Sequence, residues 1–287
     1  MQVSVLGFGG AEIGFEAAPQ DDVDILLNAA IDAGLNVIDT AECYADSEAK
    51  IGAAVAHRRS DFFLFTKCGH SSGFEMPDWD PKMLAMTIDR SLQRLQTDCV
   101  DLVQLHSCSE AILRQGDVIE VLQRAKEAGK TRYIGYSGDT TDALYAVESG
   151  AFDSLQTSVN IADQECLTLT LPKALANGMG VIAKRPVANV AWRSGANPPT
   201  NGYYQTYWER LKKLKYGFLT DEDAVSTALR FTLSQAAVNV AIVGTKNPSR
   251  WVVNSEYAKK GPLSDSALLA IRNRWYEIAT PEWVGQQ

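Results

Sequence analysis

The chain alternates between two hydrophobic patterns along nearly its whole length. Short apolar, β-branched runs are typical of buried strands, and the longer segments between them have apolar residues at i, i+3 and i+4, which is typical of helices. The short runs lie at Val3–Gly9, Asn36–Thr40, Phe62–Lys67, Val100–His106, Tyr133–Ser137, Ser154–Asn160, Gly180–Pro186 and Val240–Thr245. The pattern therefore predicts a regular series of strands, each followed by a helical connection.

The helical segments carry recognisable end signals. They are predicted at Asp22–Ala33, Pro81–Leu95, Asp117–Ala128, Asp142–Ser149 and Asp221–Ser234, with a further helix end at Lys173–Asn177. Asp80 before Pro81 is a favourable N-cap followed by a favourable first helical residue. Several helices stop at a glycine, which readily adopts the left-handed backbone found after a helix: Gly34, Gly129, Gly150 and Gly178.

Apolar strands that alternate with helices indicate a parallel sheet covered on both faces. Eight such units in 287 residues match the size of a closed (β/α)8 barrel, and a doubly wound open sheet is the competing architecture. An open dinucleotide-binding sheet should carry G-x-G-x-x-G after its first strand. Here the stretch reads GFGGAEIG, and its glycines at 7, 9, 10 and 14 do not have the spacing of that motif. The open sheet is therefore disfavoured. We therefore predict one (β/α)8 TIM-barrel domain over residues 1–287.

Two segments are long for barrel connections. Residues 188–217 follow the seventh strand as an aromatic-rich loop, and residues 262–287 predict an extra C-terminal helix with a tail. Loops after the strands build the active-site face of a barrel, so aromatic residues there either line a substrate pocket, or only cap the barrel or pack an extra helix. The candidate pocket residues are Trp79, Trp192, Tyr203, Tyr204 and Tyr207.

Charge and cysteine content narrow the class of function. The chain has 27 basic and 35 acidic residues, a formal net charge of −8, and no basic stretch interleaved with aromatics, which weighs against nucleic-acid or membrane partners. Five cysteines without a CxxC pair favour reduced thiols in a cytoplasmic protein. No apolar run approaches the roughly 20 residues of a membrane span, and no export signal is evident. His57 and His70 resemble surface residues, no two histidines have metal-ligand spacing, and we expect no metal.

Polar residues stand where the strands end. Asp39, Lys67 and His106 close the second, third and fourth strands, and Tyr44 follows Asp39 closely. Adjacent strands lie about 4.8 Å apart, so these side chains should converge on the face where a barrel does its chemistry. Pairing would keep Lys67 and Asp39 charged, and an ammonium beside a phenol should lower the pKa of Tyr44. Tyr44 would then act as a general acid or base on an oxygen that His106 orients.

The motifs around these residues resemble the aldo-keto reductase superfamily over nearly the whole chain. The matching segments are NVIDTAECY, FLFTK, VDLVQLH, RYIGYSG, LQTSVN and IVGTKNPSRWVVN. The resemblance implies that Tyr44 is the general acid, that Lys67 and Asp39 tune it, and that His106 positions a substrate carbonyl. It also implies hydride transfer with NADPH, with NADH less favoured.

The resemblance further assigns residues to the cofactor. Ser137 and Gln156 would contact the nicotinamide carboxamide, and the segment after the eighth strand would hold the adenosine 2′-phosphate. The preference for NADP rests chiefly on Arg250, because a guanidinium suits bidentate phosphate recognition. The full candidate set is Ser137, Gln156, Lys184, Arg185, Gly244, Thr245, Lys246, Arg250 and Asn254.

The chain departs from the family in three ways. It begins directly at the first strand, without the hairpin that often closes the barrel bottom. Lys184 stands where the family often stacks an aromatic ring on the nicotinamide. Val253 replaces an acidic residue that often reads adenine, which leaves that contact to Asn254.

Three functions fit these observations. The leading one is NADPH-dependent reduction of an aldehyde, ketone or sugar carbonyl, or oxidation of the corresponding alcohol. A Schiff-base aldolase would use Lys67 as nucleophile, although Asp39 would hold that lysine protonated. An NADP(H)-binding regulatory subunit with little turnover is the third. We expect a small-molecule substrate and a monomer or small homo-oligomer.

Overall fold

The computed structural model describes residues 1–286, apart from the side chain of Tyr203. Its strands form a closed parallel barrel in the order β1 to β8, with β8 hydrogen-bonded back to β1. They are β1 (Leu6–Gly9), β2 (Val37–Asp39), β3 (Phe63–Cys68), β4 (Val100–His106), β5 (Thr131–Ser137), β6 (Ser154–Ser158), β7 (Gly180–Lys184) and β8 (Val240–Gly244). The predicted (β/α)8 barrel is confirmed, and every predicted strand overlaps an observed one.

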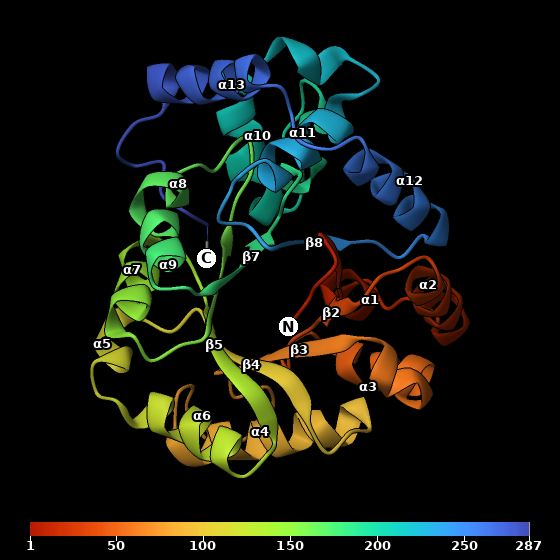
Figure 1. Cartoon of the computed structure of the whole chain (residues 1–287), viewed down its shortest axis with the longest axis vertical. Helices are drawn as coiled ribbons and strands as arrows, with labels where there is room; N and C mark the ends of the chain where they lie inside the picture. Colours follow the sequence, from red (N-terminus) through yellow and green to blue (C-terminus); the bar gives the residue numbers. More distant parts are fainter. Residues whose placement is uncertain (287) are drawn as a thin grey trace.

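Helices surround the strands (Figure 1). They are α1 (Ala11–Phe15), α2 (Gln20–Asp32), α3 (Ser47–Val55), α4 (Pro81–Leu95), α5 (Glu110–Leu113), α6 (Asp117–Glu127), α7 (Thr140–Ser149), α8 (Cys166–Leu169), α9 (Leu171–Ala176), α10 (Gly202–Leu214), α11 (Ala224–Leu233), α12 (Pro248–Lys259) and α13 (Asp265–Ile278), with short 3-10 helices η1 (Ala56–Asp61), η2 (Ala188–Ser194) and η3 (Gly217–Thr220). The predicted N-cap of α4 is observed, because the Asp80 carboxylate accepts hydrogen bonds from two backbone N–H groups of the first turn. Among the described helices, none is both long and apolar enough to cross a bilayer.

The segment predicted as a long aromatic-rich loop is largely helical. Tyr207, Leu211 and Leu214 lie on one face of α10, at i, i+4 and i+7, and are buried in an apolar cluster with α11 and α13. The three helices lie together in Figure 1. The alternative that these aromatic residues pack an extra helix is therefore observed over α10, while the bounds of that helix were not predicted because its period was not recognised. The extra C-terminal helix is confirmed as α13, followed by a tail.

Side chains inside the barrel change from apolar to polar along the strands. Every second side chain of a strand points inward. A buried apolar cluster, here called the apolar floor, consists of Val37, Phe65, Leu102, Ile182, Val240 and Ile242. Two positions further along their strands stand the inward residues Asp39, Lys67, Gln104 and Lys184. The polar layer at the carboxyl ends of the strands therefore rests on the apolar floor.

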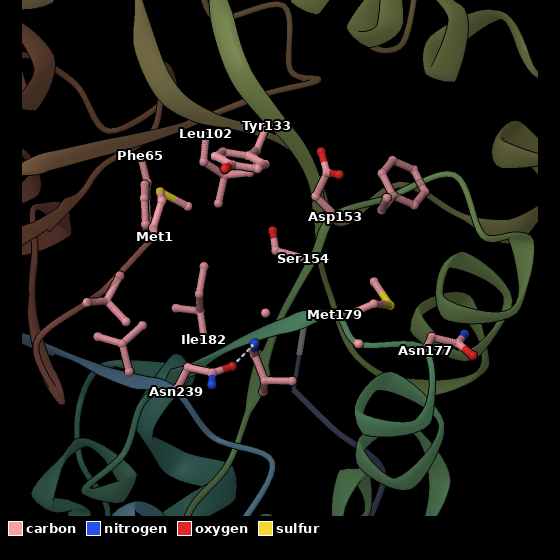
Figure 2. Close-up of a pocket in the computed structure, with 16 residues that line it drawn as sticks. Met1, Phe65, Leu102, Tyr133, Asp153, Ser154, Asn177, Met179, Ile182 and Asn239 are labelled. Atoms are coloured by element: carbon pink, nitrogen blue, oxygen red, sulfur yellow. Dashed lines mark hydrogen bonds between the residues drawn. The ribbon is translucent and has the colours of Figure 1, made fainter.

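A cavity of about 470 Å³ lies on the other side of the apolar floor, at the amino ends of the strands. Figure 2 shows Met1, Tyr133 and Ser154 among its lining residues. The Asn239 side chain accepts a hydrogen bond from the backbone N–H of Val181 there, at 2.7 Å. The apolar floor separates this cavity from the polar layer.

Helices α3 and α4 approach each other closely at Gly52. A Cβ added there would collide with the carbonyl oxygen of Arg94 and lie 2.9 Å from the carbonyl carbon of Leu95. Alanine favours a helix over glycine by about 1 kcal/mol, but overpacking costs about 1–3 kcal/mol. We therefore expect Gly52→Ala to lower the free energy of unfolding by about 1–2 kcal/mol in urea denaturation.

Gly202→Ala is the matched control for this prediction. No described atom lies within 4 Å of a Cβ added at Gly202, in the first turn of α10. This variant should keep or raise the free energy of unfolding. An equal gain in both variants would contradict the close approach at Gly52.

Candidate active site

An ion pair between neighbouring strands lies at the centre of the polar layer. Lys67 Nζ is 2.6 Å from Asp39 Oδ2, and both side chains are almost fully buried. Lys67 also donates a hydrogen bond to the carbonyl oxygen of Thr40 at 2.7 Å. Gln104 Nε2 donates to Asp39 Oδ1 at 3.4 Å. The predicted pairing of Asp39 with Lys67 is confirmed.

Burial and pairing act in opposite senses on this ion pair. Burial raises the pKa of the Asp39 carboxyl, and the neighbouring Lys67 opposes that rise. Burial alone would lower the pKa of Lys67, but attraction to Asp39 and Tyr44 exceeds that effect and raises it. A raised pKa of Asp39 favours a neutral carboxyl, whereas a raised pKa of Lys67 favours a charged ammonium. We place the proton on Lys67, because the carboxylate and the Thr40 carbonyl both stabilise an ammonium.

Tyr44 lies next to this ion pair, on the segment between β2 and α3. Its ring centroid is 5.1 Å from Lys67 Nζ. Ser47 holds the segment in place, because its hydroxyl donates to the carbonyl oxygen of Gly10 at 2.7 Å and lies 2.9 Å from the Thr40 hydroxyl. The predicted convergence of Tyr44 with Lys67 and Asp39 is therefore observed.

The predicted lowering of the Tyr44 pKa is wrong for this arrangement. Burial raises the pKa of the phenol, attraction by Lys67 opposes the rise, and Asp39 adds to it. The sequence argument counted the ammonium but not the loss of solvent around the phenol. Tyr44 therefore holds its proton at neutral pH, which suits a general acid.

His106 stands edge-on to Tyr44, with ring centroids 5.6 Å apart and an interplanar angle of 78°. Burial, with the positive charges of Lys67 and Lys184 nearby, lowers the pKa of His106 well below its ordinary value, so the ring is neutral. Its Nδ1 is 3.4 Å from Cys43 Sγ. Burial raises the pKa of the Cys43 thiol to about 11, so the thiol keeps its proton. A thiol that donates to Nδ1 places the ring proton on Nε2.

His70, predicted to be a surface residue, is partly exposed and also lies at this face, a position that the sequence analysis did not assign. Its ring centroid is 5.4 Å from that of His106 and 5.7 Å from that of Trp79. Its Nδ1 is 3.0 Å from Asp78 Oδ2. One potential ligand atom each from Cys43, His70 and His106 lies within 4.8 Å of the others. Spacing along the chain missed this cluster because its members follow or end three different strands.

The two residues assigned to the nicotinamide carboxamide lie opposite each other on β5 and β6. Ser137 Oγ donates to Gln156 Oε1 at 2.9 Å. Gln156 Nε2 is buried and makes no hydrogen bond of good geometry with the described residues, although Gln156 lies close enough to Asp39 to favour its carboxylate. A buried amide donor with spare capacity suits a carbonyl acceptor on a ligand. This pair therefore fits a carboxamide group.

Lys184 and Arg185, at the end of β7, both have protein partners. Lys184 Nζ pairs with Asp139 Oδ2 at 2.9 Å. Burial alone would raise the pKa of Asp139, but the two cations outweigh it and lower that pKa. Arg185 donates to the Ser158 hydroxyl at 3.0 Å and to the carbonyl oxygen of Gln286. These cations lie near enough to His106 to lower its pKa, so they belong to the same face.

The C-terminal tail returns from α13 to this face (Figure 1). The Gly285 N–H donates to Glu165 Oε2 at 2.7 Å, and the Gln286 N–H donates to Asp163 Oδ2 at 3.2 Å. Burial, with the nearby Asp139, raises the pKa of Asp163 to about 7. The sequence analysis did not assign the tail, because no local motif shows where a terminal segment docks.

The segment after β8 presents most of the remaining candidate cofactor residues. Gly244, Lys246 and Arg250 are exposed, Thr245 is half-buried and Asn254 is buried. Lys246 Nζ pairs with Glu16 Oε2 at 2.5 Å. Arg250 lies in the first turn of α12, and a guanidinium beside a helix N-terminus suits a phosphate group.

The aromatic residues predicted to line a substrate pocket fall into different environments. Trp79 lies beside His70, while Trp192 and Tyr204 are half-buried. Tyr207 is fully buried and donates to Asp163 Oδ2 at 3.1 Å, so it packs inside the α10 cluster and the prediction is wrong for this residue. The side chain of Tyr203 lies outside the described residues.

Comparisons with known proteins agree with this arrangement. The family model described as Aldo/keto reductase family matches residues 5–274. L-galactose dehydrogenase of Arabidopsis thaliana is 34% identical over 204 residues, which are 66% of this chain and 63% of that protein, less than two thirds of its length. D-threo-aldose 1-dehydrogenase of Pseudomonas is 27% identical over 90% of both chains. The holo form of an aldo-keto reductase from Bacillus halodurans superposes with a TM-score of 0.80 at 26% identity, over 95% of this chain and 92% of that one.

The ion pair gives a pH-dependent stability prediction. Lys67→Met leaves Asp39 buried without its cation, and breaking a buried pair costs about 3–5 kcal/mol. Burial then holds the folded pKa of Asp39 above its unfolded value. The loss of unfolding free energy in Lys67→Met, relative to wild type, should therefore be small at a pH where Asp39 is protonated in both the folded and the unfolded state. It should grow as pH rises through the raised folded pKa of Asp39. Urea unfolding from about pH 4 to about pH 8 measures this trend.

The double variant Asp39→Asn/Lys67→Met is the control for this prediction. It removes both charges and should recover most of the unfolding free energy lost in Lys67→Met, because no unpaired carboxylate remains. A deficit that does not change with pH, or a double variant as unstable as the single one, would rule out an unpaired Asp39 as the cause.

Proposed function

Because the chain belongs to the aldo/keto reductase family, we propose that it uses NADPH to reduce an aldehyde, ketone or sugar carbonyl, or oxidises the corresponding alcohol. The observation that carries this proposal is the buried Lys67–Asp39 pair beside Tyr44, with a neutral His106 next to the phenol. Relatives named as dehydrogenases of L-galactose and of D-threo-aldose favour sugars within this substrate class.

Tyr44 is the proton donor in the proposed reduction. A bound nicotinamide would supply the hydride that reaches the carbonyl carbon. Tyr44 gives its phenolic proton to the carbonyl oxygen as negative charge develops there. Lys67 stabilises the phenolate that remains, and Asp39 keeps Lys67 charged. In the reverse direction, the same phenolate removes the proton of an alcohol.

His106 orients the carbonyl in this proposal. Its pKa is too low for it to compete with Tyr44 as the acid, so it acts as a neutral hydrogen-bond donor. The contact between Cys43 Sγ and Nδ1 leaves the proton on Nε2, which is the nitrogen available to the carbonyl oxygen. Cys43 is thus a positioning residue for the His106 tautomer.

The alternative of a Schiff-base aldolase finds no support in the site. It requires Lys67 to lose its proton and attack a carbonyl. The 2.6 Å contact with Asp39 and the raised pKa of Lys67 both oppose that. The regulatory alternative shares all four residues with the reductase, and turnover distinguishes the two.

The proton-transfer role of Tyr44 gives the first functional prediction. Tyr44→Phe keeps the ring and removes the hydroxyl, so kcat for carbonyl reduction should fall by about 10²–10⁴-fold at saturating NADPH. NADPH binding, measured by quenching of tryptophan fluorescence, should stay close to wild type. The assay follows nicotinamide absorbance with a panel of aldoses, aldehydes and ketones.

Tyr145→Phe, on the outer helix α7, is the matched control and should keep wild-type kcat. Full activity in Tyr44→Phe would contradict the assignment of Tyr44 as the proton donor. A wild-type protein that binds NADPH tightly but turns over none of the panel would instead favour the regulatory alternative.

Arg250 should set the preference for NADPH, since Lys246 already pairs with Glu16. Arg250→Gln removes a charged hydrogen-bond donor, worth about 1.5–3 kcal/mol, so the Kd for NADPH should rise about 10–100-fold. The Kd for NADH, which lacks the 2′-phosphate, should change little. Lys259→Gln, at the end of the same helix, is the control. An equal loss for both cofactors would contradict recognition of the phosphate by Arg250.

A further inference from the structure

Three metal-ligating side chains meet at the active face, and of these the proposed reaction uses only His106 directly. One potential ligand atom each from Cys43, His70 and His106 lies within 4.8 Å of the others. Cys43 Sγ and His106 Nδ1, at 3.4 Å, are already about as far apart as two ligands of a tetrahedral ion. All three residues are half-buried, so an ion can reach them from solvent.

His70 is oriented as a metal ligand usually is. Its Nδ1 is 3.0 Å from Asp78 Oδ2, which leaves Nε2 for an ion. Asp78 is itself held in place, because its Oδ1 accepts a hydrogen bond from the backbone N–H of Ser71 at 2.7 Å. Ligating histidines commonly donate their other ring nitrogen to a carboxylate in this way, which fixes the ring and strengthens the ligand.

We propose that Cys43, His70 and His106 bind a divalent transition-metal ion of the Zn²⁺ class, and that the bound ion blocks the carbonyl site. One sulfur and two imidazole nitrogens suit Zn²⁺ or Co²⁺, whereas Mg²⁺ and Ca²⁺ require oxygen ligands. The fourth position of a tetrahedral ion is left for water, as in sites with three protein ligands.

Binding requires one proton to leave and no change of oxidation state. The Cys43 S–H bond breaks, its proton passes to solvent, and the sulfur lone pair forms the bond to the metal. The two imidazoles bind as neutral ligands through lone pairs. The thiolate and the Asp78 carboxylate then offset the charge of the ion, which matters because Lys67 is close by.

The position of this cluster makes the ion an inhibitor. His70 contacts both His106 and Trp79, a candidate wall of the substrate pocket. The ion would bind His106 through Nδ1, next to Cys43 Sγ, and its water would stand beside His70 and Trp79, in the path by which the carbonyl group reaches Nε2. Inhibition should therefore be competitive with the carbonyl substrate and not with the cofactor. This inhibitory role rests on the proposed function, whereas the metal site itself does not.

Titration with Co²⁺ tests the metal site without any measurement of turnover. We expect the protein to bind one equivalent and to develop a thiolate-to-cobalt charge-transfer band, with visible bands of a tetrahedral ion. Added Zn²⁺ should bleach both. Cys43→Ser should abolish the charge-transfer band. Asp78→Asn, which can still accept the hydrogen bond from Ser71, should weaken binding by about 10–100-fold.

Cys99→Ser is the matched control, because Cys99 is a half-buried thiol just before β4, at the other end of the barrel. It should leave the Co²⁺ spectrum unchanged. The site is overturned if no thiolate band forms near equimolar Co²⁺, or if the band survives Cys43→Ser.

Zn²⁺ inhibition tests the second half of the proposal. Each variant's rate with Zn²⁺ is compared with its own rate in EDTA, so any change in basal activity cancels. The Zn²⁺ inhibition constant should rise in Cys43→Ser and Asp78→Asn but not in Cys99→Ser. If the cobalt charge-transfer band forms in a protein that reduces no carbonyl, the proposed function is contradicted but the metal site is not. A band without competitive Zn²⁺ inhibition in an active enzyme would overturn the inhibitory role.

Discussion

The active face depends on one buried ion pair, Lys67 with Asp39, placed directly above the apolar floor. An isolated charge at this depth would cost several kcal/mol, so each partner is tolerated only because the neighbouring strand delivers the other. The closed barrel enforces this meeting, since hydrogen-bonded parallel strands end at the same face. Tyr44 then lies beside an ammonium that Asp39 and the Thr40 carbonyl hold in a fixed position. Burial keeps both Tyr44 and His106 neutral, and the same ammonium moderates the rise in the Tyr44 pKa while it lowers the His106 pKa further.

A second ion pair repeats this construction on the far side of the barrel. Lys184 follows the floor residue Ile182 by two positions, as Lys67 follows Phe65, and it pairs with Asp139 beyond the end of β5. Both cations are buried and balanced by one carboxylate each. Each of these two lysines is therefore kept charged at depth by a carboxylate from a neighbouring segment.

Strand order and the convergence of Asp39, Tyr44, Lys67 and His106 followed from the sequence, because alternating elements and parallel strands leave little freedom. Gln104 was also within reach of that reasoning, since it lies two residues before His106 on the same strand and so faces the same way. His70 and Cys43 were not, because loop residues have no fixed register. The Tyr44 pKa was misjudged because burial is a property of the packed structure. Tyr207 was misassigned for the same reason, as its aromatic character fits a pocket and a core equally.

In the proposed complex with NADPH, Lys184 stands where the sequence resemblance implies an aromatic ring stacked on the nicotinamide. The Lys184 ammonium is turned toward Asp139, so it offers no flat surface. Arg185 does, because a guanidinium is planar and stacks on aromatic faces. Its backbone φ of 57° is costly for a residue other than glycine, by about 1–3 kcal/mol. The contacts of its side chain with Ser158 and the tail at Gln286 hold it in that conformation. The docked tail and Arg185 thus form one unit, and in the proposed complex with NADPH the tail would lie beside the nicotinamide.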